Sequence, residues 1–338
     1  MRDTFTRPIR TPAASQTDVA GRRSAGNIGG AGRAASSGNS RAGSARDLRP
    51  LVSLTTDFGE RDALPAICRG VILGIAPDVR LLDVSHEVAK YAVLDGALLL
   101  WAALPYLPVG VHVAVVDPGV GTARLPIGVR VARGDVLVGP DNGVLLSAAD
   151  RLGGIIAAHV LEAADYRLPV VSASFHGRDV FAPAGAHLAL GVPLEAFGRP
   201  LDPSGLVRLD LPAPRVVPDE LVAAVIYVDS FGNVKLAGER SDLEAALGGL
   251  ALGDPLQVGP PLHESSLGDD GLRSREVTPA TLTWQLTFGA VPRGDLLLYA
   301  DANGRLCLAI DQGDAAARLG LRTGDRLGIR RAPPALSS

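Results

Sequence analysis

The sequence has few of the residues that mark several common classes of protein. Its two cysteines, Cys68 and Cys307, are far apart and belong to no CxxC or Cys/His pattern, so neither a disulfide framework nor a structural zinc site is indicated. The only two lysines, Lys90 and Lys235, follow no glycine pattern of a P-loop. The single Gly-Val-Gly at residues 119–121 lacks the rest of a dinucleotide fingerprint.

The sequence also lacks a concentrated basic region and a long apolar run. A formal charge of −3 and the absence of a Lys/Arg stripe argue against nucleic acid as a partner and favour a small molecule. No apolar stretch reaches about 18 residues, so neither a transmembrane helix nor a membrane partner is expected. The pair Arg22-Arg23 precedes polar residues rather than an apolar run, which does not support an export signal. We therefore expect a cytoplasmic protein.

The composition changes along the chain in a way that predicts its domain organisation. Residues 1–48 are rich in Arg, Gly, Ser and Ala and are predicted to be a disordered tail. Residues 49–211 alternate strand and helix patterns, which predicts a layered α/β domain with a mostly parallel sheet. Residues 212–218 are a proline-rich linker, and residues 219–332 form a smaller β-rich domain in which residues 263–276 are predicted to be a loop.

Apolar periodicity predicts the elements of both domains. In the first domain we expect strands at residues 51–56, 79–84, 111–116, 136–138 and 170–175, and helices at 64–75, 94–104 and 181–188. In the second domain we expect strands at 221–228, 281–288, 296–299, 306–310 and 326–329. The stretch 281–288 alternates apolar and polar residues without interruption.

Polar side chains follow the predicted strands of the first domain. These are Asp57, His86, Asp117 and His176. Because ligands bind beyond the carboxyl ends of parallel strands, we expect these groups to converge at one edge of the sheet. Each also has a simpler interpretation, since a carboxylate can cap a turn and a histidine can satisfy backbone groups. His176 is the preferred catalytic histidine, because an aromatic residue precedes it and a glycine follows it.

A metal site built from Asp57, Asp117 and His176 is an alternative, because carboxylate and imidazole groups bind divalent metals. The sequence contains no HExxH, HxH or DxD spacing. We therefore predict that no metal is bound. The alternative can be distinguished by experiment, because a metal-dependent hydrolase would lose activity with a chelator and a metal-independent enzyme would not.

Five segments in order resemble one known family. They are Thr-Thr-Asp-Phe-Gly (55–59), Asp-Val-Ser-His-Glu (83–87), Val-Asp-Pro-Gly-Val-Gly-Thr-Ala-Arg (116–124), Val-Gly-Pro-Asp-Asn-Gly (138–143) and Phe-His-Gly-Arg-Asp (175–179). Together they resemble the S-adenosyl-L-methionine (SAM) hydroxide adenosyltransferases, or SAM hydrolases, which are related to fluorinases and chlorinases. The resemblance implies an α/β domain followed by a β-barrel-like domain, and a homotrimer with active sites between subunits.

The resemblance also implies roles for individual residues. The groups that handle the attacking water correspond to Asp117, Arg124 and His176. The remaining predicted contacts surround a sulfonium nucleoside. In the first domain, Asp57 binds the ribose and Tyr91 lines the sugar pocket. In the second domain, Asp229 contacts the methionine ammonium, and Asn233 and the backbone near Ile310 contact adenine. An aromatic lining suited to a cation is formed by Phe58, Tyr91, Phe175 and Phe231.

The implied reaction is hydrolysis of SAM to adenosine and L-methionine by attack of water at the ribose 5′ carbon, with no cofactor. A 5′-halogenase is the nearest alternative. In that branch an aromatic residue stands in the place of Asp117 and a serine in the place of Gly177. A nucleoside-binding protein without turnover is a further alternative. The chain departs from the family at Asp301-Ala302, where an Asn-Ser pair is usual and the serine contacts the amino acid end of the substrate.

Overall fold

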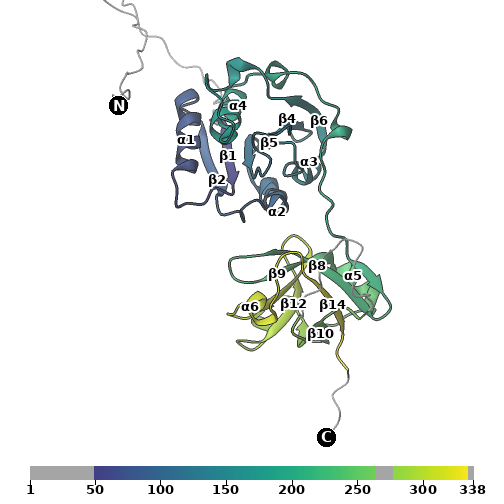
Figure 1. Ribbon diagram of the computed structural model, residues 1–338. Coiled ribbons are helices and arrows are strands. Elements are labelled where there is room, and N and C mark those ends of the chain that lie inside the picture. The colour runs from purple at the N-terminus through teal and green to yellow at the C-terminus, as the bar shows by residue number, and fades with distance from the viewer. Residues whose placement is uncertain (1–48, 263–276, 334–338) are drawn as a thin grey trace, which may run out of the picture. The chain divides into compact units, whose positions relative to one another are not determined.

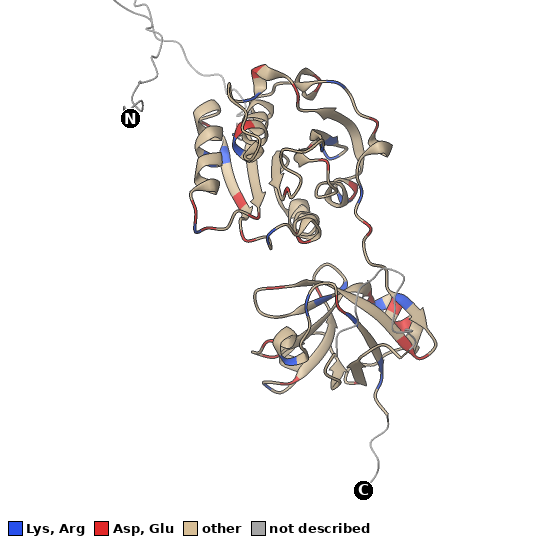
Figure 2. Cartoon of the chain, in the orientation of Figure 1, with Lys and Arg blue, Asp and Glu red and all other residues tan. Residues whose placement is uncertain are grey.

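The computed structural model describes residues 49–262 and 277–333, which contain an α/β domain and a β-barrel (Figure 1). The predicted tail at 1–48 and the predicted loop at 263–276 lie outside the described residues. No helix in the described ranges has the length and hydropathy needed to span a bilayer. Basic and acidic residues are interspersed on the elements of both domains (Figure 2).

The α/β domain is built on a six-stranded sheet in the order β2-β1-β3-β5-β4-β6. Its strands are β1 (Leu51–Thr56), β2 (Arg80–Ser85), β3 (Val111–Val115), β4 (Pro126–Val131), β5 (Val136–Pro140) and β6 (Ile155–Val160). β1 is parallel to β2 and β3, β3 is parallel to β5, and β4 is antiparallel to both of its neighbours. The prediction of a mostly parallel sheet is therefore confirmed, and the carboxyl ends of β1 and β3 lie next to each other.

Helices cover both faces of this sheet (Figure 1). One apolar core joins α1 (Leu64–Ile75) and α4 (Ala182–Ala189) to the sheet, and a second joins α2 (Val93–Ala103) and α3 (Leu146–Arg151) to its other face. Every residue of β1 and of β3 is buried. This explains why both strands are almost continuously apolar in sequence instead of alternating.

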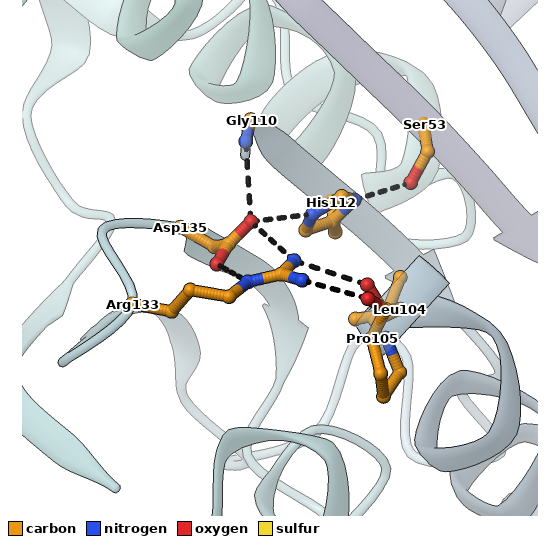
Figure 3. A network of polar contacts seen from close by, with 7 residues as sticks. All are labelled: Ser53, Leu104, Pro105, Gly110, His112, Arg133 and Asp135. Carbon is orange, nitrogen blue, oxygen red and sulfur yellow. Dashed lines mark hydrogen bonds and ion pairs between the residues drawn. The ribbon is translucent and has the colours of Figure 1, made fainter. Parts of the chain in front are cut away.

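A buried polar network stabilises the amino ends of the central strands (Figure 3). Ser53 Oγ lies 2.7 Å from His112 Nδ1, and His112 Nε2 lies 3.0 Å from Asp135 Oδ1. Arg133 pairs with Asp135 and donates to the carbonyl oxygens of Leu104 and Pro105 at the end of the helical layer. Burial alone would raise the pKa of Asp135, but hydrogen bonds from His112 and Arg133 outweigh it and hold that pKa well below its ordinary value.

The second domain is a closed barrel. Its sheet has the order β14-β10-β11-β12-β13-β9-β8-β7, and pairing of β14 with β8 closes seven of these eight strands on themselves. The strands are β7 (Arg215–Val217), β8 (Glu220–Val228), β9 (Val234–Glu239), β10 (Pro255–Gly259), β11 (Ala280–Trp284), β12 (Leu296–Ala300), β13 (Arg305–Ile310) and β14 (Arg326–Arg331), with helices α5 (Arg240–Leu247) and α6 (Ala315–Leu319). The predicted β-barrel-like domain is confirmed. β7, which pairs with β8, lies inside the segment assigned to a linker.

Two predicted strands are wrong in part or in whole. Residues 170–175 form bends and turns instead of a strand, and Val170 is 79% exposed. The strand predicted at 281–288 ends at Trp284, and Leu286 beyond it is 66% exposed. Strands β4, β6, β7, β9 and β10 and helices α3, α5 and α6 were not predicted. The remaining predicted strands and helices lie within a few residues of their observed bounds.

Candidate active site

A cavity of about 330 Å³ lies at the carboxyl ends of β1 and β3. Six predicted site residues line it: Asp57, Phe58, Tyr91, Asp117, Phe175 and His176. Sequence reasoning singled out Gly177 as the position of a halogenase serine, and it missed the other lining residues, which are Asp62, Leu64, Lys90, Val115, Val120 and Ser174. Two of these, Lys90 and Ser174, are immediate neighbours in sequence of a predicted residue.

Arg124 joins the two proposed water-handling groups. Its Nε lies 2.9 Å and 3.0 Å from the two carboxylate oxygens of Asp117, and its Nη2 also contacts Oδ2. The same Nη2 lies 3.0 Å from His176 Nδ1. The side chains of Arg124 and Asp117 are only 9% and 5% exposed. The structure thus brings all three predicted catalytic residues into one hydrogen-bonded group, in which Arg124 contacts both Asp117 and His176.

This contact determines which nitrogen of His176 carries the proton. A guanidinium can only donate hydrogen bonds, so Nδ1 of His176 must accept and Nε2 carries the hydrogen in the neutral ring. Burial lowers the pKa of His176, and the positive charge of Arg124 lowers it further. The ring is therefore held neutral, with an Nε2–H donor as its free polar group.

Close packing of two loops positions Asp117 and His176. Gly121, at φ +78°, lies so near the second loop that a Cβ there would be 2.5 Å from the Ala173 carbonyl oxygen. A glycine is needed here for its conformation and for this close approach. The Gly119 carbonyl also accepts a hydrogen bond from Thr122 Oγ1 at 2.7 Å, which tightens the turn after Asp117.

His176 is presented by a helical turn and not by a strand. It precedes a π-helical turn, η3 (Gly177–Phe181), that continues into α4. Asp179 in this turn is fully buried, pairs with Arg178 and accepts a hydrogen bond from Ser172 N at 2.8 Å. These contacts fold residues 170–175 back onto the turn, and π-helical turns are frequent at functional sites.

The aromatic part of the lining is tightly packed. The rings of Phe58 and Phe175 meet edge to face, with centroids 5.8 Å apart. A Cβ at Gly177 would lie 3.0 Å from Cζ of Phe58 and 3.4 Å from Phe175. The rings therefore leave little room for a larger residue at 177 unless Phe58 shifts.

Asp57 and Tyr91 are joined by a hydrogen bond at the cavity. Tyr91 N donates to Asp57 Oδ2 at 2.9 Å. Tyr91 has φ +67°, a left-handed conformation that is costly for a residue with a Cβ. Tyr91 is 71% exposed. Asp57 therefore stabilises a strained backbone while its Oδ1 remains available to a ligand.

His86 does not join this group. It is 2% exposed and its Nδ1 lies 2.8 Å from Thr56 Oγ1, so it has the structural role that was the alternative interpretation. Asn142 has a similar role, because its Nδ2 donates to the Val116 carbonyl at 2.8 Å and holds the end of β3. Within the described residues, no group of three or more His, Cys, Asp or Glu side chains is placed to hold a metal ion.

The other four predicted residues line a separate cavity of about 730 Å³ in the barrel domain. These are Asp229, Phe231, Asn233 and Ile310, together with Phe288, Asp311, Gln312, Gly313 and Asp314. Asp229 Oδ1 accepts from the backbone of Phe231 and Asn233, and its Oδ2 accepts from Asn233 Nδ2 at 3.0 Å. Phe231 is 77% exposed, whereas Asn233 and Ile310 are buried.

Asp301 takes part in the barrel's own structure. Its Oδ1 accepts hydrogen bonds from Asn303 N and Arg305 N, and its Oδ2 pairs with Lys235 at 2.6 Å. The residue thus closes the turn between β12 and β13. The adjacent Ala302 provides no hydroxyl group.

Comparison with known proteins assigns the chain to a family. The model of the SAM hydroxide adenosyltransferase N-terminal domain matches residues 52–198, and that of the C-terminal domain matches residues 223–328. The chain belongs to this family. It is 44% identical over 280 residues to an (R)-S-adenosyl-L-methionine hydrolase of Salinispora tropica, covering 83% of this chain and 97% of the relative. It is 35% identical over 286 residues to the Thermus thermophilus protein of that name, covering 82% and 98%.

The chain is also similar to a more distant relative and to a solved structure. A fluorinase of Actinopolyspora mzabensis is 28% identical over 309 residues, covering 84% of this chain and 98% of the fluorinase. The fold also matches the crystal structure of an uncharacterized conserved protein from Thermotoga maritima, with a TM-score of 0.71 and 30% identity over 83% of this chain and all of that one.

Proposed function

We propose that this protein hydrolyses SAM to adenosine and L-methionine by attack of water on the ribose 5′ carbon. The observation that carries this proposal is the contact of Arg124 with both Asp117 and His176 at the wall of the α/β cavity. Family members named SAM hydrolases, at 35–44% identity, support it.

The geometry supports distinct roles for the two groups on the water. His176 Nε2–H donates a hydrogen bond to the water oxygen and orients it, while a carboxylate oxygen of Asp117 accepts a water hydrogen. As the new C–O bond forms, the C–S bond breaks and its electron pair stays on sulfur, which leaves as the neutral thioether of methionine. The water proton passes to Asp117 and then to solvent. Loss of a general base usually costs about a hundredfold in rate, so Asp117→Ala should lose at least that much. His176→Ala should lose a similar factor, because the water loses the donor that orients it.

The substrate's own chemistry supports a reaction without metal or cofactor. A sulfonium is already a good leaving group, so the protein needs to position one water and the 5′ carbon in line. The rings of Phe58 and Phe175 offer a partly dry, aromatic surface that suits a cation. Asp57 Oδ1 is available for a ribose hydroxyl. Turnover that persists with a chelator supports this proposal, and loss of turnover that added metal restores contradicts it.

Packing around Gly177 favours hydrolysis over halogenation. The halogenase branch has a serine at this position, and a Cβ here would press on Phe58. Asp117, where that branch has an aromatic residue, is paired with Arg124. Incubation with SAM in water and in chloride or fluoride, followed by product identification, tests the assignment. Adenosine with methionine supports it, a halogenated nucleoside shows the alternative, and saturable adenosine binding without methionine release indicates a binding protein.

We also propose that the active protein is a homotrimer whose sites lie between subunits. The predicted ligand contacts are divided between a cavity in the α/β domain and a cavity in the barrel, each with an exposed aromatic residue, Tyr91 or Phe231. A shared site would combine the α/β cavity of one subunit with the barrel cavity of another.

Complementation tests this arrangement. Asp117→Ala inactivates the α/β part and Asn233→Ala the barrel part. If each site takes one part from each of two subunits, random mixing of the two chains in a trimer restores about one quarter of the wild-type sites. If each site lies within one chain, co-expression restores none. A cytoplasmic location is also proposed, and cell fractionation tests it.

A further inference from the structure

Lys90 is the only lysine or arginine in the lining of the α/β cavity. The other charged residues of that lining are the carboxylates Asp57, Asp62 and Asp117, and Arg124 neutralises only the last of these. Within residues 49–262 and 277–333, the Lys90 ammonium has no hydrogen bond or ion pair. An ammonium group at an otherwise acidic cavity is therefore available to an anionic group of a ligand.

The backbone that presents Lys90 is held in a costly conformation. Ala92 N donates to the Ala89 carbonyl at 3.0 Å, which makes residues 89–92 a β-turn with Lys90 at its second position and Tyr91 at its third. The positive φ of Tyr91 is typical of a type II turn, in which glycine normally occupies the third position. The Asp57–Tyr91 hydrogen bond stabilises this turn against the cavity. Strain of this kind is commonly retained where the presented side chains have a function.

The turn that carries Lys90 is seated beside Asp57. It follows β2 in sequence, but Val88 N donates to the Thr56 carbonyl and Tyr91 N to Asp57 Oδ2, which places it at the carboxyl end of β1. β1 neighbours β3, the strand that precedes Asp117. SAM carries one anionic group, the carboxylate of its amino acid end. That carboxylate is therefore the group of the substrate with which the Lys90 ammonium can pair.

We propose that Lys90 binds the carboxylate of the substrate's amino acid end, on a turn held in place by Asp57. This inference rests on the proposed function and adds a residue that determines substrate specificity. The carboxylate needs a partner, because the cavity's own carboxylates repel it and because Ala302 provides no hydroxyl where the family resemblance implies a serine. The ammonium of Lys90 supplies a charge-assisted hydrogen bond at that end.

The test compares SAM with its decarboxylated analogue, which keeps the sulfonium and the amine. The wild-type protein should prefer SAM in kcat/KM, and Lys90→Met should lower kcat/KM for SAM by about tenfold, the size expected for one charge-assisted hydrogen bond. The loss should appear mainly in KM, because the substrate carboxylate is remote from the 5′ carbon and its contact is the same in the ground state and the transition state. With the decarboxylated analogue, Lys90→Met should equal or exceed the wild type. Lys90→Arg, which keeps the charge, should retain most of the preference.

Arg61→Met is the matched control, since Arg61 is exposed, lies outside the lining and carries the same charge. It should leave the ratio of the two substrates unchanged, which separates direct binding from a general change in charge. An unchanged ratio in Lys90→Met, with normal turnover of SAM, overturns the role of Lys90 and leaves the proposed function intact. Absence of SAM turnover in the wild type overturns the proposed function, and this inference with it.

Discussion

Replacement of Arg124 by methionine is the perturbation that best separates catalysis from stability at the α/β cavity. Methionine keeps much of the length and apolar volume of the side chain but removes every donor. Asp117 then loses two hydrogen bonds from Nε and the contact with Nη2, and His176 loses the partner of its Nδ1. Because both members of the ion pair are over nine-tenths buried, the remaining carboxylate is left without compensation.

The expected loss of stability follows from this burial. Breaking a buried pair by removing one partner costs about 3–5 kcal/mol, and urea denaturation of the Arg124→Met protein should show a loss of this size. Arg130→Met is the matched control, because its pair with Glu195 is 31% and 53% exposed. Exposed pairs contribute about 0–1 kcal/mol, so the control should change little. Arg124→Lys keeps the charge but cannot contact both Asp117 and His176 in the same way, so its loss of stability should be intermediate.

The pKa of His176 distinguishes a lost catalytic arrangement from a merely unstable protein. In the wild type, burial and then Arg124 hold the pKa of His176 below its ordinary value of 6.5, while Asp117 acts in the opposite direction. Without Arg124 the carboxylate acts unopposed, so the pKa of His176 should rise, and an NMR titration of its ring measures the rise. Turnover at alkaline pH should still fall by at least about a hundredfold, because the water loses its orientation. A His176 pKa that stays in place or falls refutes the proposed contact of Arg124 with His176.

Three further predictions concern packing, protonation and the buried network. Gly121→Ala should lower the free energy of unfolding by about 2–3 kcal/mol and reduce kcat, because residue 121 has a positive φ and lies close to the Ala173 oxygen. Gly154→Ala is the control, since Gly154 has φ +90° but open space around it, and it should lower the free energy of unfolding by about 1 kcal/mol. Equal losses in thermal denaturation would contradict the loop contact. The folded state resists protonation of His176, so the stability of the wild-type protein should fall as pH drops through about 6.5. The His176→Gln protein should lose less stability than the wild type between about pH 7.5 and 5.5. Parallel curves of stability against pH argue against a lowered pKa of His176. Asp135→Asn breaks the buried network with His112 and Arg133, and it should lower the free energy of unfolding by about 2–4 kcal/mol in a denaturation experiment. Its kcat/KM should stay within about twofold of the wild type. A large loss of kcat/KM would link this network to the candidate active site.

The sequence predicts well those parts of the site that follow buried parallel strands. β1 and β3 are short, apolar and followed by glycine turns, so the places of Asp57 and Asp117 could be predicted from local pattern alone. Their adjacency in the sheet could not, because strand order depends on long-range pairing that leaves no mark in either segment. The contact of Arg124 with both Asp117 and His176 depends on the same long-range arrangement.

The segment before His176 shows where local pattern fails. Residues 170–175 combine β-branched and aromatic residues as a strand would, but no strand of the sheet pairs with them. Asp179 and the close approach of Gly121 to Ala173 hold the segment as a loop.

Strand β11 is shorter than predicted because its pairing ends early. Its antiparallel partner β10 begins at Pro255, opposite Thr283, so the alternating residues beyond Trp284 have no antiparallel neighbour, and Phe288 instead lines the barrel cavity.

Two histidine–carboxylate groupings in the α/β domain show why residue types alone do not identify a catalytic centre. Ser53, His112 and Asp135 are arranged as a nucleophile, a base and its orienting acid would be (Figure 3). Both ring nitrogens of His112 are engaged, however, and all three side chains are 0–1% exposed, so no substrate reaches them. His176 has a partner on Nδ1 and lines a cavity, which leaves Nε2–H for a ligand. We therefore assign the chemistry to His176 because one of its ring nitrogens is available at a cavity. A serine, a histidine and a carboxylate in hydrogen-bond contact are not sufficient.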